Sequence, residues 1–406
     1  MKHLFTCICL LGLITSVHGQ TFTSFTSTDG LLSNNTLCLA KGADGSMWFG
    51  TQSGVSKYDG NDWTGYAKAD YPGMADDNIL SIYVNAAGET WIGTDFGASV
   101  LNEDAWTTYT TTDGLGNNKV LCIAEDKDGH TWFGTNSGAT EYDGQNWTSY
   151  GTSDGLPFGG VNSITLHTDG TLWLGTGLGG VAIFDGSSFT EITEDDGLIS
   201  DKIRAVDFDA DGQIWVGTAD GLSLLNSDKS HNTNYTRIYT LPGSDTLNPI
   251  EDVAVGGDGV VWAGVYVDYL VTEGGVCAYA AGQWHEFDVD DGLVGPVVRA
   301  LEIDDDNNVW VATSSGITKI SDHKLSIDQG VQPPVITVYP NPVKDELYVV
   351  IPNASADQLI ELYDMSMQLV LNQRFIQSAN LSVGHLPRGV YFMKIDGAVK
   401  RIVISD

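Results

Sequence analysis

Two arginines are the first residues in this sequence that suggest chemistry. Arg204 and Arg299 occupy equivalent positions in two copies of a segment that recurs along the chain. A polysaccharide lyase uses such a cation to neutralise a uronate beside a His or Tyr base. However, the chain holds 53 Asp and Glu residues against 19 Lys and Arg, so pairing of both arginines with acids is the favoured interpretation. Both remain candidates for ligand binding, and no catalytic residue is assigned.

An aspartate-rich segment is the second candidate. Asp207, Asp209 and Asp211 alternate along the chain, a spacing of oxygen ligands that calcium loops use. An EF-hand would have Glu eleven residues after its first Asp, where this chain has Thr218. We therefore favour a hairpin turn and expect neither a metal nor a cofactor, with Ca²⁺ at these three residues as the alternative. His130 lies in a similar turn, where we expect it to be solvated.

The charge of the chain excludes several classes of partner. The formal net charge is −34 over 406 residues, so too few cations are present to build a basic patch. Nucleic acid is a poor partner, because binding to phosphates needs clustered Lys and Arg. Adhesion to an anionic membrane surface is disfavoured for the same reason.

The N-terminus has the pattern of a targeting segment. Residues 1–19 combine a positive start, a short apolar run and a small final residue, which predicts a secretory signal peptide cleaved before Gln20. We expect no transmembrane segment. Cys38, Cys122 and Cys277 follow, and we predict three buried thiols, with one disulfide and one free thiol as the alternative.

Tryptophans mark an internal repeat. The segment Trp-x-Gly-Thr occurs five times, and two further copies each differ from it at one position. Successive tryptophans are 41 to 48 positions apart. This period is typical of a four-stranded propeller blade. The remaining four tryptophans fall in the expected fourth strands, so we assign all eleven to core packing rather than to glycan stacking. The seven in the repeated segment are Trp48, Trp91, Trp132, Trp173, Trp215, Trp262 and Trp310.

The seventh copy lacks its fourth strand. Residues 22–25 near the N-terminus match the strand at 147–150, and both are followed by Asp-Gly-Leu. The N-terminal strand should therefore complete the last blade, which removes the free sheet edge there. We predict an all-β fold with a seven-bladed β-propeller over residues 20–325, closed by its N-terminal strand.

The repeat resembles the two-component regulator propeller family. The resemblance rests on Asp-Gly-Leu followed by Asn or Asp, and on the pattern D-x-x-G-x-x-W-x-G-T with a glycine after it. It extends over about residues 21–325. This family forms ligand-sensing domains in some bacterial hybrid sensor kinases, so the resemblance implies a ligand-binding β-propeller.

One blade departs from the repeat. The sixth copy carries about six extra residues between its second and third strands. Tyr266, Asp268 and Tyr269 in this insertion could bind a sugar or a peptide. The insertion should share a face with the loops that enter each blade, which contain Asn34 and Asn118, and such loop faces usually bind the ligand. The alternative is a loop whose sequence has diverged from the repeat without acquiring a function.

The last part of the chain is a different domain. Residues 326–335 form a linker with a Pro-Pro pair, and short alternating apolar runs follow. These runs predict a small Ig-like β-sandwich over residues 336–406.

Two short motifs characterise this tail. They are Tyr339, Pro340, Asn341 and Pro342 near its start, and Gly389, Val390 and Tyr391 near its end. With these residues the tail resembles the type A C-terminal sorting domain of the type IX secretion system. The resemblance implies export through the periplasm of a Bacteroidota-type cell, and recognition of residues 336–406 by the outer-membrane machinery.

These features predict a secreted or cell-surface protein, most simply a monomer, that binds an extracellular glycan, peptide or surface partner without catalysis. A propeller-type polysaccharide lyase or glycoside hydrolase is the first alternative. A component of the secretion or attachment machinery is the second. Fold alone does not choose between these functions.

Overall fold

The computed structural model divides into two compact units, Met1–Ile327 and Asp328–Asp406. It describes residues 20–102, 105–239, 248–267, 273–323, 325, 337–350, 358–364, 368–376, 378–395 and 398–405. Both units are all-β, and within these ranges the helical segments are two single 3-10 turns, η1 (Thr152–Asp154) and η2 (Glu194–Asp196). No helix among the described residues is long and apolar enough to cross a membrane.

The first unit consists of seven four-stranded antiparallel sheets, numbered here one to seven along the chain. Sheets one to three are β2 (Thr36–Lys41), β3 (Met47–Thr51), β4 (Gly54–Tyr58), β5 (Trp63–Tyr66); β6 (Ser81–Val84), β7 (Thr90–Thr94), β8 (Gly97–Asn102), β9 (Ala105–Tyr109); and β10 (Val120–Glu125), β11 (Thr131–Thr135), β12 (Gly138–Tyr142), β13 (Trp147–Tyr150).

Sheets four to six are β14 (Val161–Leu166), β15 (Leu172–Thr176), β16 (Val181–Phe184), β17 (Phe189–Ile192); β18 (Ile203–Phe208), β19 (Ile214–Thr218), β20 (Gly221–Leu225), β21 (His231–Tyr235); and β22 (Ile250–Val255), β23 (Val261–Val267), β24 (Glu273–Ala280), β25 (Gln283–Phe287). Sheet seven is β26 (Val298–Ile303), β27 (Val309–Thr313), β28 (Gly316–Ser321) and the N-terminal β1 (Thr21–Phe25).

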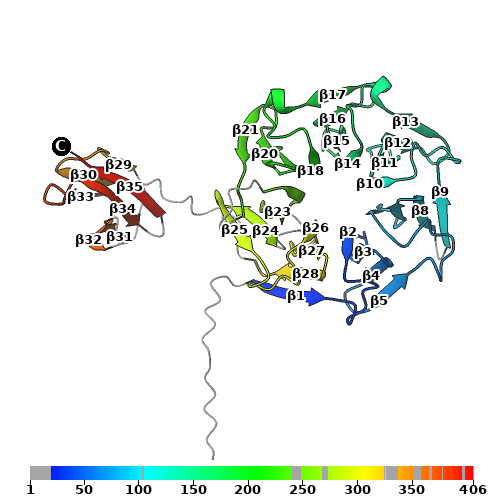
Figure 1. Cartoon of the computed structure of the whole chain (residues 1–406), viewed down its shortest axis with the longest axis horizontal. Coiled ribbons are helices and arrows are strands. Elements are labelled where there is room, and N and C mark those ends of the chain that lie inside the picture. The colour runs from blue at the N-terminus through cyan, green and yellow to red at the C-terminus, as the bar shows by residue number, and fades with distance from the viewer. Residues whose placement is uncertain are drawn as a thin grey trace, which may run out of the picture. The chain divides into compact units, whose positions relative to one another are not determined.

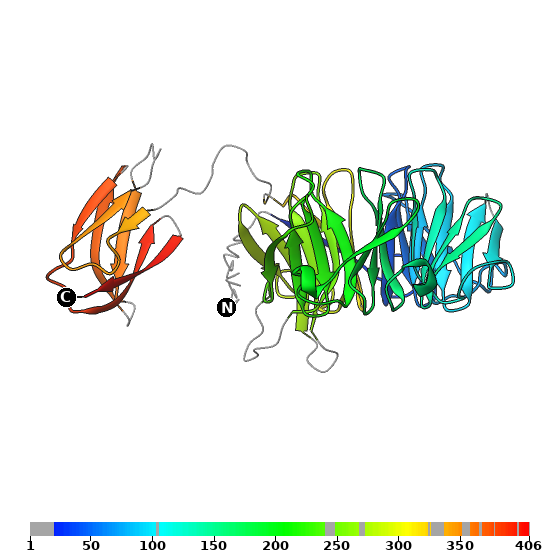
Figure 2. The ribbon, with the colours of Figure 1, turned by 90° about the horizontal axis from the view of Figure 1, so that it is seen from above.

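The seven sheets lie around a central opening (Figure 1). The first strand of each sheet is innermost and contacts the first strand of the next sheet, and β26 in turn contacts β2. Figure 2 shows the sheets edge on, with their strands running from one face of the ring to the other. Each sheet therefore presents one strand to the opening and buries its faces against its two neighbours.

The strand β1 joins the two ends of the ring. It pairs antiparallel with β28, from Thr21 opposite Ser321 to Phe25 opposite Ile317, as the sequence predicts. The Phe25 ring lies 5.8 Å from the Trp63 ring of sheet one and 5.7 Å from the Trp310 ring of sheet seven. Phe25 therefore fills the seam between the first and last sheets.

A turn aspartate explains the spacing of the repeated motif. In sheet three, Oδ1 of Asp126 accepts the backbone N–H groups two and four residues later, both at 2.9 Å. Its Oδ2 accepts the indole N–H of Trp132 at 2.9 Å. The carboxylate thus shapes the turn and also satisfies the polar atom of a fully buried ring. The same pairing joins Asp209 to Trp215 and Asp304 to Trp310.

Replacing Asp209 by alanine is expected to lower the free energy of unfolding by about 2 kcal/mol, because the turn and the buried Trp215 indole lose their acceptor. Asp211→Ala is the control, because this exposed neighbour should change stability by less than about 0.5 kcal/mol. Urea unfolding followed by tryptophan fluorescence measures both, since all 11 Trp lie between positions 48 and 310. Equal losses in the two variants would contradict this role of Asp209.

The threonine of the motif holds the turn between the second and third strands. Thr135 donates its hydroxyl to the Gly138 carbonyl at 3.0 Å and accepts the Ser137 N–H at 3.2 Å. Equivalent bonds occur at the motif threonines of all sheets except the sixth. Sheet six has Val265 at this position, and residues 268–272, which follow it, lie outside the described residues. Loss of this hydroxyl accompanies the longer turn that the sequence predicts there.

The second unit contains two antiparallel sheets that share one core. Fully buried Leu347 and Leu381 from the first sheet join Leu362, Met393 and Ile402 from the second. The two sheets therefore pack face to face. In sheet order they are β29 (Thr337–Tyr339), β30 (Glu346–Val350), β33 (Ser378–Ser382), and β32 (Leu369–Phe375), β31 (Gln358–Tyr363), β34 (Gly389–Ile395), β35 (Ala398–Ile404).

Candidate functional site

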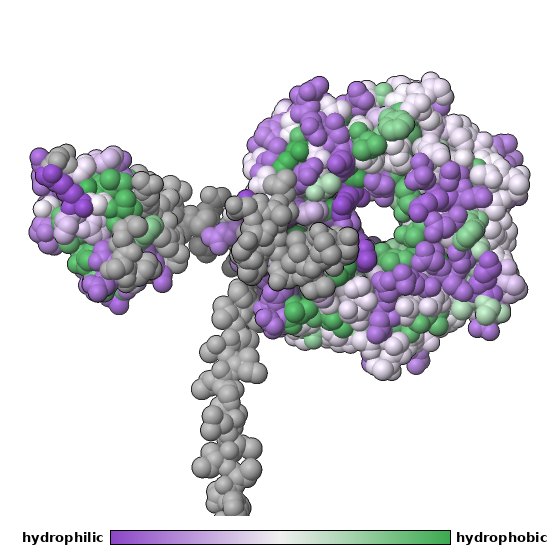
Figure 3. Space-filling view, in the orientation of Figure 1, coloured by the Kyte–Doolittle hydropathy of each residue, from purple (hydrophilic) through white to green (hydrophobic). Residues whose placement is uncertain are grey.

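The innermost strands of the first unit surround a cavity of about 390 Å³. Residues from all seven sheets line it, and Figure 3 shows it as an opening through the ring. A cavity that collects side chains from every repeat is the natural place for a ligand site.

A backbone irregularity aims one residue per sheet at this cavity. In six sheets the pairing of the first two strands shifts register near the start of the inner strand, which leaves one residue between the paired positions. Such β-bulges redirect side chains beside functional sites. In sheet two the equivalent residue precedes β6. These seven residues, here called the bulge ring, all line the cavity: Leu37, Leu80, Leu121, Asn162, Arg204, Glu251 and Arg299.

The bulge ring is apolar on one side and polar on the other. Sheets one to three contribute leucines, whereas sheets four to seven contribute an amide, two arginines and a carboxylate. Figure 3 shows the same division, with hydrophobic residues on one side of the opening and hydrophilic residues on the other. The ring can therefore contact a ligand that has one apolar face and one hydrogen-bonding face.

The structure places both arginines predicted from the sequence in this ring. The Nη1 atom of Arg204 forms an ion pair with Oε1 of Glu251, which agrees with the expected pairing to an acid. Arg299 lines the same cavity and is exposed. Sequence reasoning missed Glu251 and Asn162, although both stand at the repeat position of the two arginines and an alignment of the seven copies would have found them.

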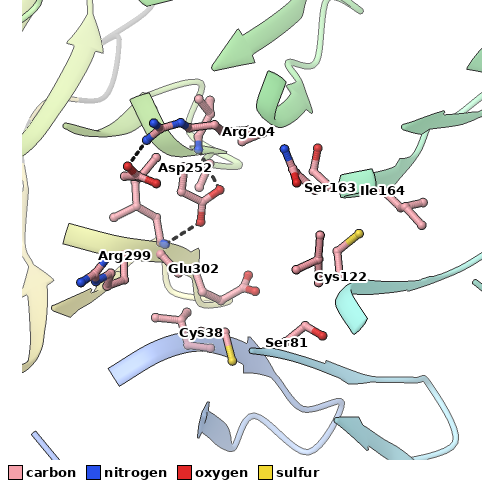
Figure 4. A pocket seen from close by; sticks show the side chains of 18 of the residues that line it. Cys38, Ser81, Cys122, Ser163, Ile164, Arg204, Asp252, Arg299 and Glu302 are labelled. Atoms are coloured by element: carbon pink, nitrogen blue, oxygen red, sulfur yellow. Dashed lines mark hydrogen bonds and ion pairs between the residues drawn. The ribbon is translucent and has the colours of Figure 1, made fainter. Parts of the chain in front are cut away.

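Asp207, Asp252 and Glu302 also line the cavity, and Figure 4 shows Asp252 and Glu302 there. Oδ2 of Asp207 accepts the Val255 N–H of the next sheet at 2.8 Å. Oδ2 of Asp252 likewise accepts the Leu301 N–H at 2.8 Å. Burial raises the pKa of Asp207 to about 6 and the pKa values of Asp252 and Glu302 to about 7, against the opposing effect of backbone N–H donors. Asp207 and Asp252 therefore hold adjacent inner strands together.

The three candidate calcium ligands do not converge. Asp207 is directed to the next sheet, whereas Asp209 holds its own turn and the Trp215 indole. Asp211 is exposed. Among the described residues, one group of three His, Cys, Asp or Glu side chains lies close enough to share a metal ion, and it belongs to sheet three.

The predicted ligand residues outside the ring have other surroundings. Oδ1 of Asn34 accepts the Ser27 N–H at 2.7 Å, and Oδ1 of Asn118 accepts the Thr111 N–H at 2.8 Å. Both amides thus shape the loops that enter sheets one and three. Asp268, Tyr269 and the side chain of Tyr266 lie outside the described residues, so their role stays a prediction. The thiols of Cys38, Cys122 and Cys277 are free, as expected, and Cys38 and Cys277 are buried, whereas Cys122 is only partly buried.

The residues of the predicted sorting motif make several contacts within the second unit. Oδ1 of Asn341 accepts the Val403 N–H at 2.9 Å. The buried Tyr391 donates its hydroxyl to the Pro387 carbonyl at 2.6 Å. Tyr339 is half exposed and stacks on Tyr348 with ring centroids 5.7 Å apart. The remaining motif residues adjoin these: Pro340 and Pro342 follow cis peptide bonds, and Gly389 and Val390 begin β34.

Family models match the chain in both units. Residues 337–405 match the secretion system C-terminal sorting domain. Residues 30–53, 114–137 and 197–220 match the two-component regulator propeller repeat. No curated protein matches the chain by sequence.

Solved structures share the fold. The extracellular domain of a hybrid two-component system from B. thetaiotaomicron is 18% identical, with a TM-score of 0.62 over 95% of this chain and 59% of that chain. PorZ, a surface component of the type IX secretion system of Porphyromonas gingivalis, is 17% identical, with a TM-score of 0.53 over 96% and 58%. Virginiamycin B lyase from Staphylococcus aureus is 13% identical, with a TM-score of 0.56 over 74% and 99%.

The chain spans slightly less than three fifths of the first two of these proteins. At these identities the likeness concerns the fold and not the activity. The sorting domain indicates export to the outer surface or secretion, and thus interaction with the type IX machinery. The chain is a β-propeller protein that carries two-component regulator propeller repeats and a type IX secretion C-terminal sorting domain.

Proposed function

We propose that the first unit is a seven-bladed β-propeller, closed by β1, that binds an extracellular ligand without catalysis at its bulge ring. The second unit is then an Ig-like sandwich that delivers the propeller to the outer-membrane machinery. The observation that carries the proposal is the register shift at one position in six sheets. Bulges of this kind re-aim side chains and are over-represented next to functional sites, and here they recur at the residue that each of these sheets turns to the cavity.

The chemistry of the ring suggests the class of ligand. Leu37, Leu80 and Leu121 offer an apolar surface, and the opposite side offers amide, guanidinium and carboxylate groups. A neutral glycan has a matching combination, since one face of a sugar ring is apolar and its hydroxyls donate and accept. A peptide is the other candidate. The net charge of −34 disfavours a polyanion.

Binding is preferred to lyase or hydrolase activity because of what lines the cavity. Its described lining holds two arginines but no His or Tyr. Acids with raised pKa values are present, but Asp207 and Asp252 already accept backbone N–H groups of the next sheet. These bonds fix both carboxylates between neighbouring sheets, and the described lining offers no His or Tyr with which they could share acid–base work.

The proposal is tested with a panel of neutral and acidic oligosaccharides and peptides. We expect the wild-type protein to retain at least one member and to release no new oligosaccharide, as followed by mass spectrometry. Arg299→Gln should weaken retention at least about tenfold, the loss expected when a ligand group is left without its charged partner. Lys127→Gln removes one positive charge in an exposed turn of sheet three and should leave retention unchanged.

Two results would contradict the proposal. Product release from any panel member would make the protein an enzyme. Retention that is equal in wild type and Arg299→Gln would place the ligand outside the bulge ring.

A further inference from the structure

Sheet three carries a mixed group of nitrogen and oxygen ligands away from the central cavity. Asp126, His130 and Glu141 each offer one ligand atom, and these atoms all lie within 4.8 Å of one another. Nδ1 of His130 is 2.6 Å from Oε1 of Glu141 and 3.6 Å from Oδ2 of Asp126. The three side chains are 33%, 12% and 18% exposed for the His, Asp and Glu. His130 is therefore not the freely solvated turn residue that the sequence suggests.

Surrounding groups hold both carboxylates in place. The Trp132 indole N–H donates to Oδ2 of Asp126 at 2.9 Å. The Tyr150 hydroxyl donates to Oε2 of Glu141 at 2.8 Å. The Trp132 and Tyr150 rings stack, with centroids 5.1 Å apart and planes inclined by 12°. Outer hydrogen bonds of this kind orient metal ligands, and each leaves a lone pair of its carboxylate free.

The other sheets show that this group is a departure from the repeat. The residue opposite the motif tryptophan is Lys57 in sheet one, Glu141 in sheet three and Lys319 in sheet seven. The two lysines pair with turn aspartates, Lys57 with Asp44 at 3.0 Å and Lys319 with Asp304 at 3.3 Å. Sheets one and seven thus place a lysine opposite the tryptophan, whereas sheets two, four, five and six place the apolar residues Val100, Ile183, Leu224 and Ala278 there. Among the described residues, sheet three alone combines a second carboxylate and a histidine at this position.

We propose that Asp126, His130 and Glu141 form a Zn²⁺ site. Zinc takes His nitrogen and carboxylate oxygen at about 2.0–2.2 Å in a tetrahedron, which places the ligand atoms about 3.4 Å apart. The ligand atoms of His130 and Asp126 are already close to this value. The Glu141 oxygen has to move away from His130 by less than about 1 Å and, since no two of the three ligand atoms are more than 4.8 Å apart, toward Asp126 by at most about 1.4 Å. Three protein ligands leave the fourth position to water. Zinc at Nδ1 displaces the proton that this nitrogen shares with Glu141: a neutral His130 then carries its proton on Nε2, and a protonated His130 releases one proton to solvent.

The repeat supplies matched variants for the test. Sheet seven has Asn308 and Lys319 at the positions of His130 and Glu141, and Asn308 makes the same backbone bond to its turn aspartate at 2.9 Å. His130→Asn and Glu141→Lys therefore introduce residues that an intact sheet of this protein already accommodates. His167→Asn is the control, because His167 of sheet four contacts only one acid, Asp169 at 2.8 Å, among the ion pairs described.

The measurement is calorimetric titration of the full chain, without an affinity tag, with zinc chloride at about pH 8, where the His130 proton is displaced most easily. We expect one zinc per chain in the wild type and in His167→Asn. Binding should weaken at least about tenfold in His130→Asn and in Glu141→Lys. All four proteins should melt alike in the presence of a chelator.

Some results would overturn the site. A wild type without a saturable zinc site would do so, as would equal zinc affinity in the wild type and the two site variants. If a variant melts early, cobalt is titrated into the wild type instead. Absorption bands typical of four-coordinate cobalt would support the site, and the spectrum of the hydrated ion alone would contradict it.

Discussion

Replacing Phe25 by alanine is expected to lower the free energy of unfolding of the first unit by about 3 kcal/mol. The Phe25 ring lies within 5.8 Å of three aromatic rings, those of Tyr58, Trp63 and Trp310. Its loss leaves a cavity between sheets one and seven, which lie at opposite ends of the chain. Because β1 supplies the outer strand there, the weakened seam also exposes the edge of β28.

Thr23→Ala is the matched control on the same strand. Thr23 pairs with Lys319 through its backbone and is exposed, so its replacement should cost less than about 0.5 kcal/mol. Urea unfolding followed by tryptophan fluorescence reports on the first unit, because residues 336–406 contain no Trp. If Phe25→Ala were as stable as Thr23→Ala, the seam would not depend on β1.

Raising the pH from about 5 to about 8 is expected to lower the free energy of unfolding by on the order of 3 kcal/mol. Burial raises the pKa of Asp207 to about 6 and the pKa values of Asp252 and Glu302 to about 7. Between the unfolded pKa values near 4 and these values, the folded state holds protons that the unfolded state has lost. Stability is therefore highest below about pH 4 for these groups and falls as the pH rises through 6 to 7.

Other titrating groups determine which pH range and which substitution give a clear test. Asp44, Asp143, Asp169 and Asp185 have pKa values lowered to about 2 by hydrogen bonds that outweigh desolvation, so their contribution is lost only in stronger acid. The pKa of His130 is raised mainly by its hydrogen bond to Glu141. Its titration therefore also lowers stability as the pH rises, as that of the three cavity acids does. A single substitution is therefore needed to separate the contribution of the cavity acids from that of His130.

Asp252→Asn serves this purpose. Its remaining oxygen can still accept the Leu301 N–H, but it does not ionise, so the decline in stability between pH 5 and 8 should shrink by roughly 1–2 kcal/mol. Asp211→Asn, on an exposed turn, should leave the decline unchanged. The prediction would be wrong if stability rose with pH over this range. It would also be wrong if the free energy of unfolding of Asp252→Asn changed with pH as that of the wild type does.

Much of the first unit could be predicted because its stabilising contacts are local and repeated. A turn aspartate, a tryptophan six residues later and a threonine three residues after that make their hydrogen bonds within two successive hairpins, as Asp209, Trp215 and Thr218 do. Such short-range bonds leave a periodic pattern in the chain. The same reasoning identified the N-terminal strand, because residues 22–25 repeat the fourth-strand pattern that the seventh copy lacks.

The candidate sites depended on contacts between distant residues. Arg204 and Glu251 are 47 positions apart, and Asp252 and Leu301 are 49 apart, so neither pairing follows from the spacing within one copy. The bulges that form the ring change backbone register without a sequence signal of their own. His130 looked like a solvated turn residue because Glu141 reaches it from a neighbouring strand.

The number of repeats, the strand that completes the last sheet and the sorting domain could thus be predicted, because each is encoded in residues close together in the chain or repeated along it. The side chains that share the cavity, the acids that hold neighbouring sheets together and the residues around His130 became known from the folded structure alone. Closing the ring brings residues some 40 to 50 positions apart into hydrogen-bonding distance, and that proximity depends on the geometry of closure rather than on any local propensity.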